Sequence, residues 1–235
     1  MAVKTAIVGL GIMGQRMLQQ MVCHEGYAPV ALWDPNPDAC RQALQLAPNA
    51  AIAANADEAI SAADLVYLAC PPVPRKAFAL LAARNGKSVF LEKPLGVDIT
   101  DSEYLVVQIE GLGVPAAVNF TQAAGDALMD VSQAAKSGAL GDVIGVDIVV
   151  TYGEWPRGWQ VAADWLRFRA EGGMTREVIS HFLFFVERIL GPLSVVYASP
   201  TYPDDPALCE THLLARLETA DGKPVSIMAS VGGAQ

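Results

Sequence analysis

The sequence predicts an α/β protein with an N-terminal, doubly wound parallel sheet, followed by a shortened α+β domain with an open, mainly antiparallel sheet. A Gly-x-Gly-x-x-Gly motif at residues 9–14 lies between an apolar run and a helical pattern. Up to residue 120, apolar runs alternate with helical stretches, which is typical of parallel strands joined by crossover helices. Beyond it, polar and apolar residues alternate within the runs, as in strands with one face in solvent. We therefore expect two domains, over residues 1–120 and 121–235.

Composition and charge exclude several classes of protein. With 235 residues, 52% of them hydrophobic, the chain can bury a substantial core. Its net charge of −9 argues against a nucleic-acid partner, because phosphate backbones bind basic surfaces. We expect no membrane span, because no apolar run reaches the roughly 18 residues that a spanning helix needs. The chain enters a strand almost at once, which predicts that there is no secretory signal.

The cysteines and histidines predict neither a disulfide framework nor a metal site. None of the four cysteines shows C-x-x-C spacing, and the three histidines do not cluster. We therefore expect no metal and a reducing, cytoplasmic location. The residues concerned are Cys23, Cys40, Cys70 and Cys209, and His24, His181 and His212.

The glycine motif is interpreted as a phosphate-binding turn between the first strand, which ends at Val8, and a helix. Gly9 would allow the tight turn, Gly11 would let a pyrophosphate approach the backbone, and Gly14 would let the helix pack closely on the strand. The N–H groups at the start of that helix, which include those of Ile12 and Met13, would face the phosphates. The motif predicts dinucleotide binding.

A carboxylate follows the second predicted strand. The apolar run 30–33 ends in Asp34, twenty residues beyond Gly14. At this spacing a carboxylate can accept hydrogen bonds from the adenosine ribose. Asp34 would also repel a 2′-phosphate, and the two residues after it include no arginine, so NAD is favoured over NADP. The alternative is that Asp34 only caps the next helix, which has Pro37 in its first turn.

The other elements of the first half follow from apolar runs and turn residues. Strands are predicted at residues 30–33, 50–53, 65–69, 88–91 and 115–119. Helices are predicted at residues 37–46, from Asn55 or Asp57, at 77–84 and at 101–110.

The stretch Cys70-Pro71-Pro72-Val73-Pro74 predicts a loop after the strand at 65–69, because proline donates no ladder hydrogen bond. Cys70 is interpreted as a small packing residue rather than a nucleophile, since no basic residue lies near it in the sequence. Ligands of doubly wound sheets lie beyond the carboxyl ends of the strands. The glycine motif, Asp34, the residues 70–72 and the pair Glu92-Lys93 should therefore surround one cleft.

The second half predicts a helix at 126–137, a strand at 143–150, an apolar helix at 175–190, and strands at 211–217 and 225–231. Trp155, Trp159 and Trp165 in the intervening loop could line a substrate pocket, although packing at the seam between the two domains is the favoured interpretation. The sequence stops at Gln235 within a predicted sheet. Because an open sheet edge is a liability, we expect a missing tail, a partner strand or a shortened chain.

Three side chains have the chemistry of a catalytic site. Lys93 closes the fifth strand before Pro94, at the edge where substrates bind, although a surface lysine is the alternative. Glu177 and His181 stand four residues apart on the predicted helix and hence on one face. A carboxylate orients an imidazole and favours its protonated form, which suits a general acid or base. A buried structural pair is the alternative.

Together these motifs resemble the Gfo/Idh/MocA family of nicotinamide-dependent oxidoreductases, and the resemblance covers almost the whole chain. It is most specific in the E-K-P and S-G-x-L-G-D-V elements. The motifs are Gly9–Gly14, Asp34, Cys70-Pro71-Pro72, Glu92-Lys93-Pro94-Leu95, Ser137–Val143, and Gly172-Gly173 leading to the helix with His181.

The resemblance implies a Rossmann domain, a C-terminal domain with an open sheet, and hydride transfer between NAD, or NADP, and a hydroxyl or carbonyl group of a sugar, cyclitol or related molecule. Lys93 would hydrogen-bond the reacting oxygen and help to hold the nicotinamide. His181 would take the hydroxyl proton, with Glu177 beside it. Asn119, at the end of the sixth strand, would complete the cofactor site. Members often dimerise through the open sheet, so a dimer or tetramer is expected.

The chain departs from the family pattern at several positions. Glu177 replaces the usual aspartate, and Ile179 replaces a glycine between it and His181. Arg75 stands where a histidine is often found, and the stretch Asn119-Phe120-Thr121-Gln122 lacks the usual arginine. The chain is also shorter than is usual. There are two alternative hypotheses: the chain is a dinucleotide-binding regulator without turnover, or it is an inactive fragment of an enzyme.

Overall fold

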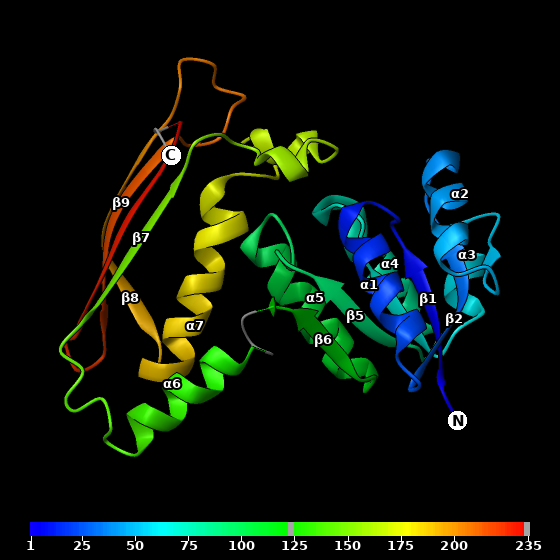
Figure 1. Ribbon diagram of the computed structural model, residues 1–235, viewed down its shortest axis with the longest axis horizontal. Helices are drawn as coiled ribbons and strands as arrows, with labels where there is room; N and C mark the ends of the chain where they lie inside the picture. Colours follow the sequence, from blue (N-terminus) through cyan, green and yellow to red (C-terminus); the bar gives the residue numbers. More distant parts are fainter. Residues whose placement is uncertain (122–124, 233–235) are drawn as a thin grey trace. The chain divides into compact units, whose positions relative to one another are not determined.

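The computed structural model describes residues 1–121 and 125–232 and divides into two compact units, Met1–Asn119 and Phe120–Gln235 (Figure 1). Each unit has its own sheet and its own core. Gln122, the last residue of the stretch that begins at Asn119, and Gln235 at the end of the sequence lie outside the described residues.

The first unit is built on a parallel sheet of six strands in the order β3-β2-β1-β4-β5-β6. The order reverses at β1, which has β2 on one side and β4 on the other, so the carboxyl end of β1 is the switch point where such folds bind ligands. This confirms the predicted doubly wound sheet. The strands are β1 (Val3–Val8), β2 (Tyr27–Trp33), β3 (Ala51–Ile52), β4 (Leu65–Leu68), β5 (Ser88–Glu92) and β6 (Ala116–Asn119).

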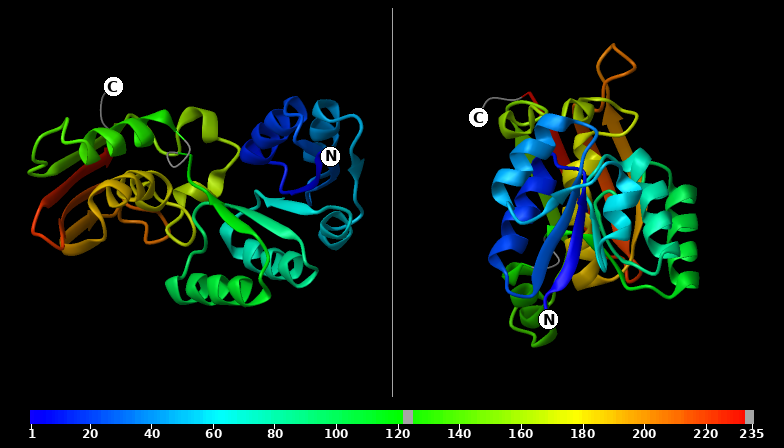
Figure 2. Two further views of the ribbon diagram at one scale, coloured as in Figure 1. Left: turned by 90° about the horizontal axis from the view of Figure 1, so that it is seen from below. Right: turned by 90° about the vertical axis from the view of Figure 1, so that its right-hand side faces the viewer.

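Helices cover both faces of this sheet (Figure 2). Buried residues of α1 and α2, including Leu18 and Ala43, pack in a core with Ile7 and Leu32. Those of α3, α4 and α5 form the core on the opposite face, around Val66. The helices are α1 (Ile12–Cys23), α2 (Pro37–Leu46), α3 (Ala56–Ser61), α4 (Pro72–Arg84) and α5 (Ile99–Leu112).

Side-chain caps explain where several of these helices begin. Asn36, Asn55 and Asp98 precede α2, α3 and α5, and each accepts a hydrogen bond from a backbone N–H in the first turn. The predicted helix at 77–84 is wrong in its start, because α4 already begins at Pro72. Proline is tolerated in a first helical turn, where its missing N–H has no intrahelical partner anyway.

The second unit has a four-stranded sheet in the order β7-β10-β9-β8, with one face packed against α7. The outer strand β7 is parallel to β10, while the two other pairings are antiparallel. The sheet is therefore mixed and mainly antiparallel, as predicted. Its elements are α6 (Asp126–Lys136), β7 (Val146–Tyr152), α7 (Ser180–Leu190), β8 (Leu193–Thr201), β9 (His212–Thr219) and β10 (Pro224–Val231).

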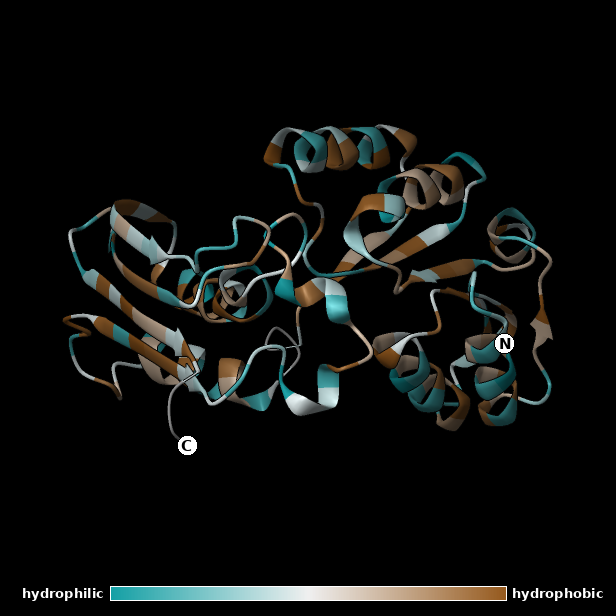
Figure 3. Ribbon diagram, turned by 90° about the horizontal axis from the view of Figure 1, so that it is seen from above, coloured by the Kyte–Doolittle hydropathy of each residue, from teal (hydrophilic) through white to brown (hydrophobic). Residues whose placement is uncertain are grey.

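Alternation along these strands separates the buried face of the sheet from the exposed one. In β9, Leu213, Ala215 and Leu217 are buried in the core with α7, whereas Leu214 between them is exposed. Figure 3 shows hydrophobic residues running through the strands of both sheets.

Two features of the second unit differ from the sequence prediction. Strand β8 was not predicted, because almost all of its residues are exposed and the two-residue alternation is absent. The single helix predicted at 175–190 begins as a π-helix, Thr175–Ile179, and becomes α-helical only at Ser180. Within the described residues, no helix is long and apolar enough to cross a membrane.

Candidate functional site

The glycine turn combines two glycines that are held by close packing with one that faces open space. Gly9 has a φ of +94°, and a Cβ there would overlap the backbone of Ala69 and Cys70. A Cβ on Gly14 would overlap the carbonyl of Gly9. At Gly11, by contrast, a Cβ would meet no atom within 4 Å. The turn therefore leaves open space beside Gly11 at the start of α1.

The start of α1 is suited to an anion. Gly11 is its N-cap and provides no side-chain cap, and the first turn contains no acidic residue. The N–H groups at Ile12 and Met13 and the positive end of the helix dipole therefore lie at the end of α1 that adjoins the open space beside Gly11. This arrangement fits the pyrophosphate of a dinucleotide.

Asp34 lies directly after β2 and joins the glycine turn. Its Oδ2 accepts a hydrogen bond from Leu10 N at 2.7 Å, and its Oδ1 accepts one from Asn36 N at 2.8 Å. Asn36, not Asp34, is the N-cap of α2, so the capping alternative for Asp34 is wrong. Each carboxylate oxygen has a further lone pair that can accept a hydroxyl hydrogen bond.

A buried carboxylate links the carboxyl ends of β4, β5 and β6. Glu92 is only 4% exposed, and its Oε1 accepts hydrogen bonds from the Tyr67 hydroxyl and from Asn119 Nδ2, the latter at 2.7 Å. Burial, and then the nearby charge of Glu92, raises the pKa of Tyr67 far above its usual value, so that the phenol remains a donor. Sequence reasoning missed Tyr67, although a tyrosine within a buried strand needs a partner for its hydroxyl.

Arg75 fixes the backbone on both sides of Lys93. This guanidinium is 2% exposed and donates hydrogen bonds to Glu92 O at 2.6 Å, to Pro94 O, and to Cys70 O at 2.5 and 3.2 Å. It therefore ties the start of α4 to the turn after β5. The sequence contained a signal for this role, because Arg75 is the one charged residue among the apolar residues on the buried face of α4.

Replacing Arg75 with methionine is expected to lower the free energy of unfolding by on the order of 3 kcal/mol, because three buried or partly buried carbonyl groups lose a charged donor. Arg84→Met, at the exposed end of the same helix, is the matched control. Urea unfolding followed by circular dichroism measures both variants. An equal loss of unfolding free energy in Arg75→Met and Arg84→Met would contradict the role of Arg75 in fixing the backbone around Lys93.

Cys70, Pro71 and Pro72 connect β4 to α4. Burial raises the pKa of the Cys70 thiol to about 11, so the thiol is protonated at neutral pH and is a poor nucleophile. Pro71 precedes α4 as its N-cap, and Pro72 is buried in its first turn. The residues predicted to surround one cleft thus lie together at the carboxyl ends of β1, β2, β4 and β5.

The other two predicted catalytic residues belong to the second unit. Glu177 lies in the π-helical segment and is 7% exposed. His181 lies in the first turn of α7, with its ring edge against Phe120 at a centroid distance of 5.6 Å. Phe120 in turn stacks on Phe184 at 4.6 Å.

The double glycine before this helix is required by packing. A Cβ on Gly172 would overlap the backbone of Leu166, and Gly173 has a φ of +109° beside the Glu210 carboxylate. Glu210 is buried, and its Oε1 accepts the backbone N–H of Thr175 at 2.6 Å. These contacts fix where the segment bearing Glu177 begins.

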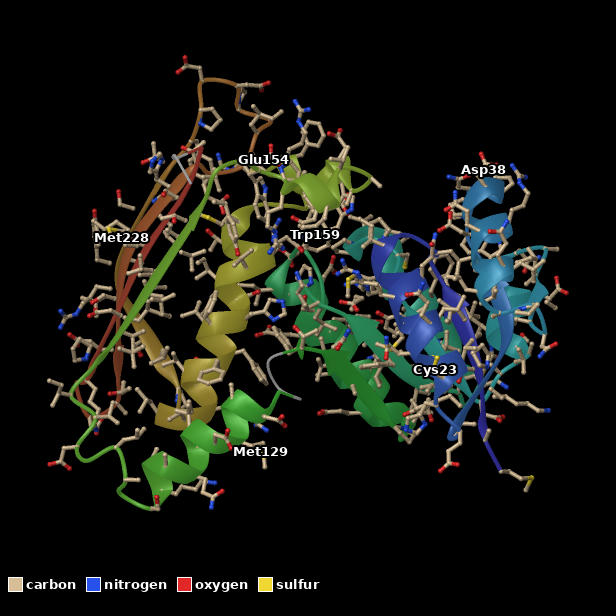
Figure 4. All side chains as sticks on the ribbon, in the orientation of Figure 1. Cys23, Asp38, Met129, Glu154, Trp159 and Met228 are labelled. Atoms are coloured by element: carbon tan, nitrogen blue, oxygen red, sulfur yellow. The ribbon has the colours of Figure 1, made fainter. Side chains whose placement is uncertain are left out.

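The tryptophans of the loop after β7 differ in environment. Trp155 packs against the core of the second unit and donates from Nε1 to Leu166 O at 2.9 Å, so it is a packing residue within that unit. Trp159 is 46% exposed and lies against the guanidinium of Arg157. Figure 4 labels Trp159 and Glu154 in this loop.

Comparison with known proteins supports an oxidoreductase. The family model GFO_IDH_MocA, described as an oxidoreductase family with an NAD-binding Rossmann fold, matches residues 3–120. An uncharacterized oxidoreductase of Streptococcus pneumoniae is 27% identical over 178 residues, 73% of this chain. The inositol 2-dehydrogenase of Burkholderia multivorans is 35% identical over 101 residues, 41% of this chain.

The fold of the whole chain is also that of a solved structure. The crystal structure of a putative myo-inositol dehydrogenase from Sinorhizobium meliloti matches 99% of this chain and 70% of its own, with a TM-score of 0.85 and 22% identity. The matched segment spans 46% of the length of the Streptococcus relative and 30% of the length of the Burkholderia one.

Proposed function

The chain belongs to the Gfo/Idh/MocA oxidoreductase family, and on that basis we propose that it transfers hydride between a nicotinamide dinucleotide and a hydroxyl or carbonyl group of a sugar, cyclitol or related small molecule. The observation that carries the proposal is the open space beside Gly11, which adjoins the start of α1, where no side chain caps the helix, within the residues matched by the family model. When bound there, the nicotinamide donates or accepts the hydride.

The first unit provides the groups that bind and orient the cofactor. The N–H groups at the start of α1 hold the pyrophosphate, and Asp34 accepts hydrogen bonds from the adenosine ribose. Cys70, Pro71 and Pro72 form the wall beside the glycine turn. Glu92 and Asn119, which hydrogen-bond to each other, support the edge of the sheet next to Lys93.

Lys93 acts on the reacting oxygen. Lys93 follows β5 directly, and Arg75 donates hydrogen bonds to the Glu92 and Pro94 carbonyls on either side of it. The backbone that carries the ammonium group is therefore held in place at the ligand-binding edge of the sheet. From there the ammonium donates a hydrogen bond to the substrate oxygen, and it stabilises the negative charge that develops on this oxygen during hydride transfer.

His181 moves the proton. In the oxidation direction the imidazole accepts the hydroxyl proton while hydride leaves the adjacent carbon, and it returns that proton in reduction. Glu177, four residues earlier and largely buried, is the carboxylate that orients the imidazole. The Phe120 ring against His181 limits the positions that the imidazole can take.

Asp34 should decide the choice between NAD and NADP. Asp34→Asn retains one acceptor oxygen for the backbone but removes the charge that repels a 2′-phosphate. We expect the preference for NADH over NADPH, measured as the ratio of dissociation constants in fluorescence titrations, to fall by about tenfold or more. Asp38→Asn, an exposed residue on α2, is the matched control. An unchanged ratio in Asp34→Asn would show that this carboxylate does not contact the ribose.

Turnover should be assayed by following NADH absorbance with a panel of cyclitols, sugars and their keto derivatives. Binding of NADH together with turnover supports the proposal that the protein is an oxidoreductase. Binding without turnover on the panel supports the alternative, a dinucleotide-binding regulator of the same fold.

We further propose a homo-oligomer formed through the open sheet of the second unit. Val149, Met228 and Leu214 lie side by side in register on β7, β10 and β9, and all three are exposed. An apolar row of this kind fits a subunit interface.

A further inference from the structure

The backbone of Leu10, between the first two glycines of the motif, is held by a side chain on each side. Its N–H donates to Asp34 Oδ2 at 2.7 Å, and its carbonyl accepts a hydrogen bond from Gln15 Nε2 at 2.9 Å. Asp34 follows β2, and Gln15 lies in the first turn of α1, so that all three residues belong to the first unit. The peptide groups before and after Leu10 are therefore each fixed by a different side chain.

The amide of Gln15 is itself oriented by two acceptors. Its Nε2 lies 2.9 Å from Leu10 O and 3.4 Å from Gln42 Oε1 on α2. An amide nitrogen has two N–H groups, so each has an acceptor here. Gln15 is half-buried, and its backbone N–H donates to Gly11 O at 3.0 Å as part of the helix. The side chain thus reaches back from the helix onto the turn that precedes it.

Gly11 makes the peptide group between residues 10 and 11 easy to rotate. Reversing the direction of this peptide would carry the φ of Gly11 from −70° into the positive region, which glycine adopts readily and other residues rarely do. A Cβ at Gly11 would meet no atom within 4 Å, so the close packing found at Gly9 and Gly14 does not hold this residue. The hydrogen bond from Gln15 to Leu10 O opposes the reversal.

We propose that Gln15 is a positioning residue for the dinucleotide, which keeps the Gly11 N–H, rather than the Leu10 carbonyl, turned toward the pyrophosphate. This inference rests on the proposed function. The C=O and N–H of a trans peptide point in opposite directions, so that a donor on Leu10 O directs the Gly11 N–H to the other side. An N–H on that side attracts a phosphate oxygen, whereas a carbonyl oxygen would repel it.

The test compares four variants of the full chain. Gln15→Met removes the donor with little change in side-chain length, and Gln15→Lys restores a donor. Gln19→Met and Gln19→Lys are the matched controls, because Gln19 is exposed and lies about one turn further along α1. Isothermal titration calorimetry measures the dissociation constants for NADH and ADP-ribose, and thermal unfolding measures the stability of each ligand-free protein.

We expect Gln15→Met to raise the dissociation constants for NADH and ADP-ribose alike by about 5- to 10-fold, because both ligands contain the pyrophosphate. The ligand-free variant should unfold within a few degrees of the wild type, since the added group meets the same half-buried site. Gln15→Lys should recover part of the affinity, and both Gln19 variants should bind NADH about as well as the wild type.

A second measurement follows the turn itself without a ligand. In protein labelled with nitrogen-15 glycine, the amide resonance of Gly11 is assigned by its loss in Gly11→Ala. This resonance should be a single sharp signal in the wild type and should broaden or split in Gln15→Met, as the peptide exchanges between two directions. A role of Gln15 in the stability of α1 alone would not change the Gly11 resonance selectively.

Wild-type NADH affinity in Gln15→Met would overturn the inference. Weakened binding with an unchanged Gly11 resonance, or a loss of affinity for NADH but not for ADP-ribose, would overturn it as well. The proposed function would stand in each of these cases, because the wild-type protein still binds NADH. Failure of the wild-type protein to bind NADH or NADPH would instead overturn the proposed function itself.

Discussion

Replacing Gly14 with alanine is expected to destabilise the first unit by on the order of 3 kcal/mol or more, because the added methyl would overlap the carbonyl of Gly9. The methyl would clash with a backbone atom, which cannot rotate away as a flexible side chain could. Helix α1 would therefore have to move away from the glycine turn. Thermal or urea unfolding followed by circular dichroism measures the loss.

Gly11→Ala is the matched variant, since it adds the same methyl group three residues away. At this position the methyl meets no atom within 4 Å, so we expect stability close to that of the wild type. The methyl would, however, occupy the open space beside the backbone of residue 11 that is assigned to the pyrophosphate. The dissociation constant for NADH, measured by calorimetry, should therefore rise by about tenfold or more.

The two variants thus separate packing from ligand binding at one turn. Undiminished NADH affinity in a well-folded Gly11→Ala protein would mean that the pyrophosphate does not approach this glycine. Wild-type stability in Gly14→Ala would mean that α1 does not pack against the turn as described.

Replacing Lys93 with alanine should reduce turnover by about 10²- to 10⁴-fold, because the reacting oxygen would lose a charged hydrogen-bond donor. Cofactor affinity should change little, since the phosphate and ribose contacts lie elsewhere on the sheet edge. Steady-state kinetics on the best substrate of the panel and an NADH titration measure the two quantities separately.

Lys87→Ala is the matched control for this prediction. Lys87 directly precedes β5, at the opposite end of the strand from Lys93, and its Nζ donates to Ser61 O at 3.2 Å. Its replacement should leave turnover unchanged. If Lys93→Ala retained wild-type turnover, the lysine would have a structural role only, as in the alternative interpretation of the sequence.

Local pattern was sufficient to predict the first unit. The strands lie in apolar runs whose residues are buried by helices on both faces, and Asn55 caps a helix where the sequence predicted a helix start. The alternation of apolar and polar residues also predicted β9 and β10 correctly, because one face of their sheet packs on α7 and the other is exposed.

The features that sequence reasoning missed depend on contacts between distant residues. Tyr67 and Glu92 are 25 residues apart, and Arg75 and Glu92 are 17 apart, so that no local periodicity links them. Strand β8 was missed for a different reason. It pairs with β9 at the edge of the sheet but buries neither face, which leaves no hydrophobic pattern to detect.

The stretch of prolines after β4 was misinterpreted because proline is disfavoured in the interior of a helix but accepted in the first turn. Arg75, which directly follows the last of these prolines and is buried, donates hydrogen bonds to Cys70 O and to Glu92 O, the latter 17 residues away. A tertiary contact thus explains the helix start that local propensity alone placed at Ala77.

The most direct test of the central claim, that the glycine turn binds a nicotinamide dinucleotide, is a fluorescence titration of the wild-type protein with NADH. We predict saturable binding with one site per chain, an increase in nicotinamide emission, and displacement by NAD. If neither NADH nor NADPH bound saturably to the folded protein, the claim would be contradicted, and so would the proposal that the protein is an oxidoreductase.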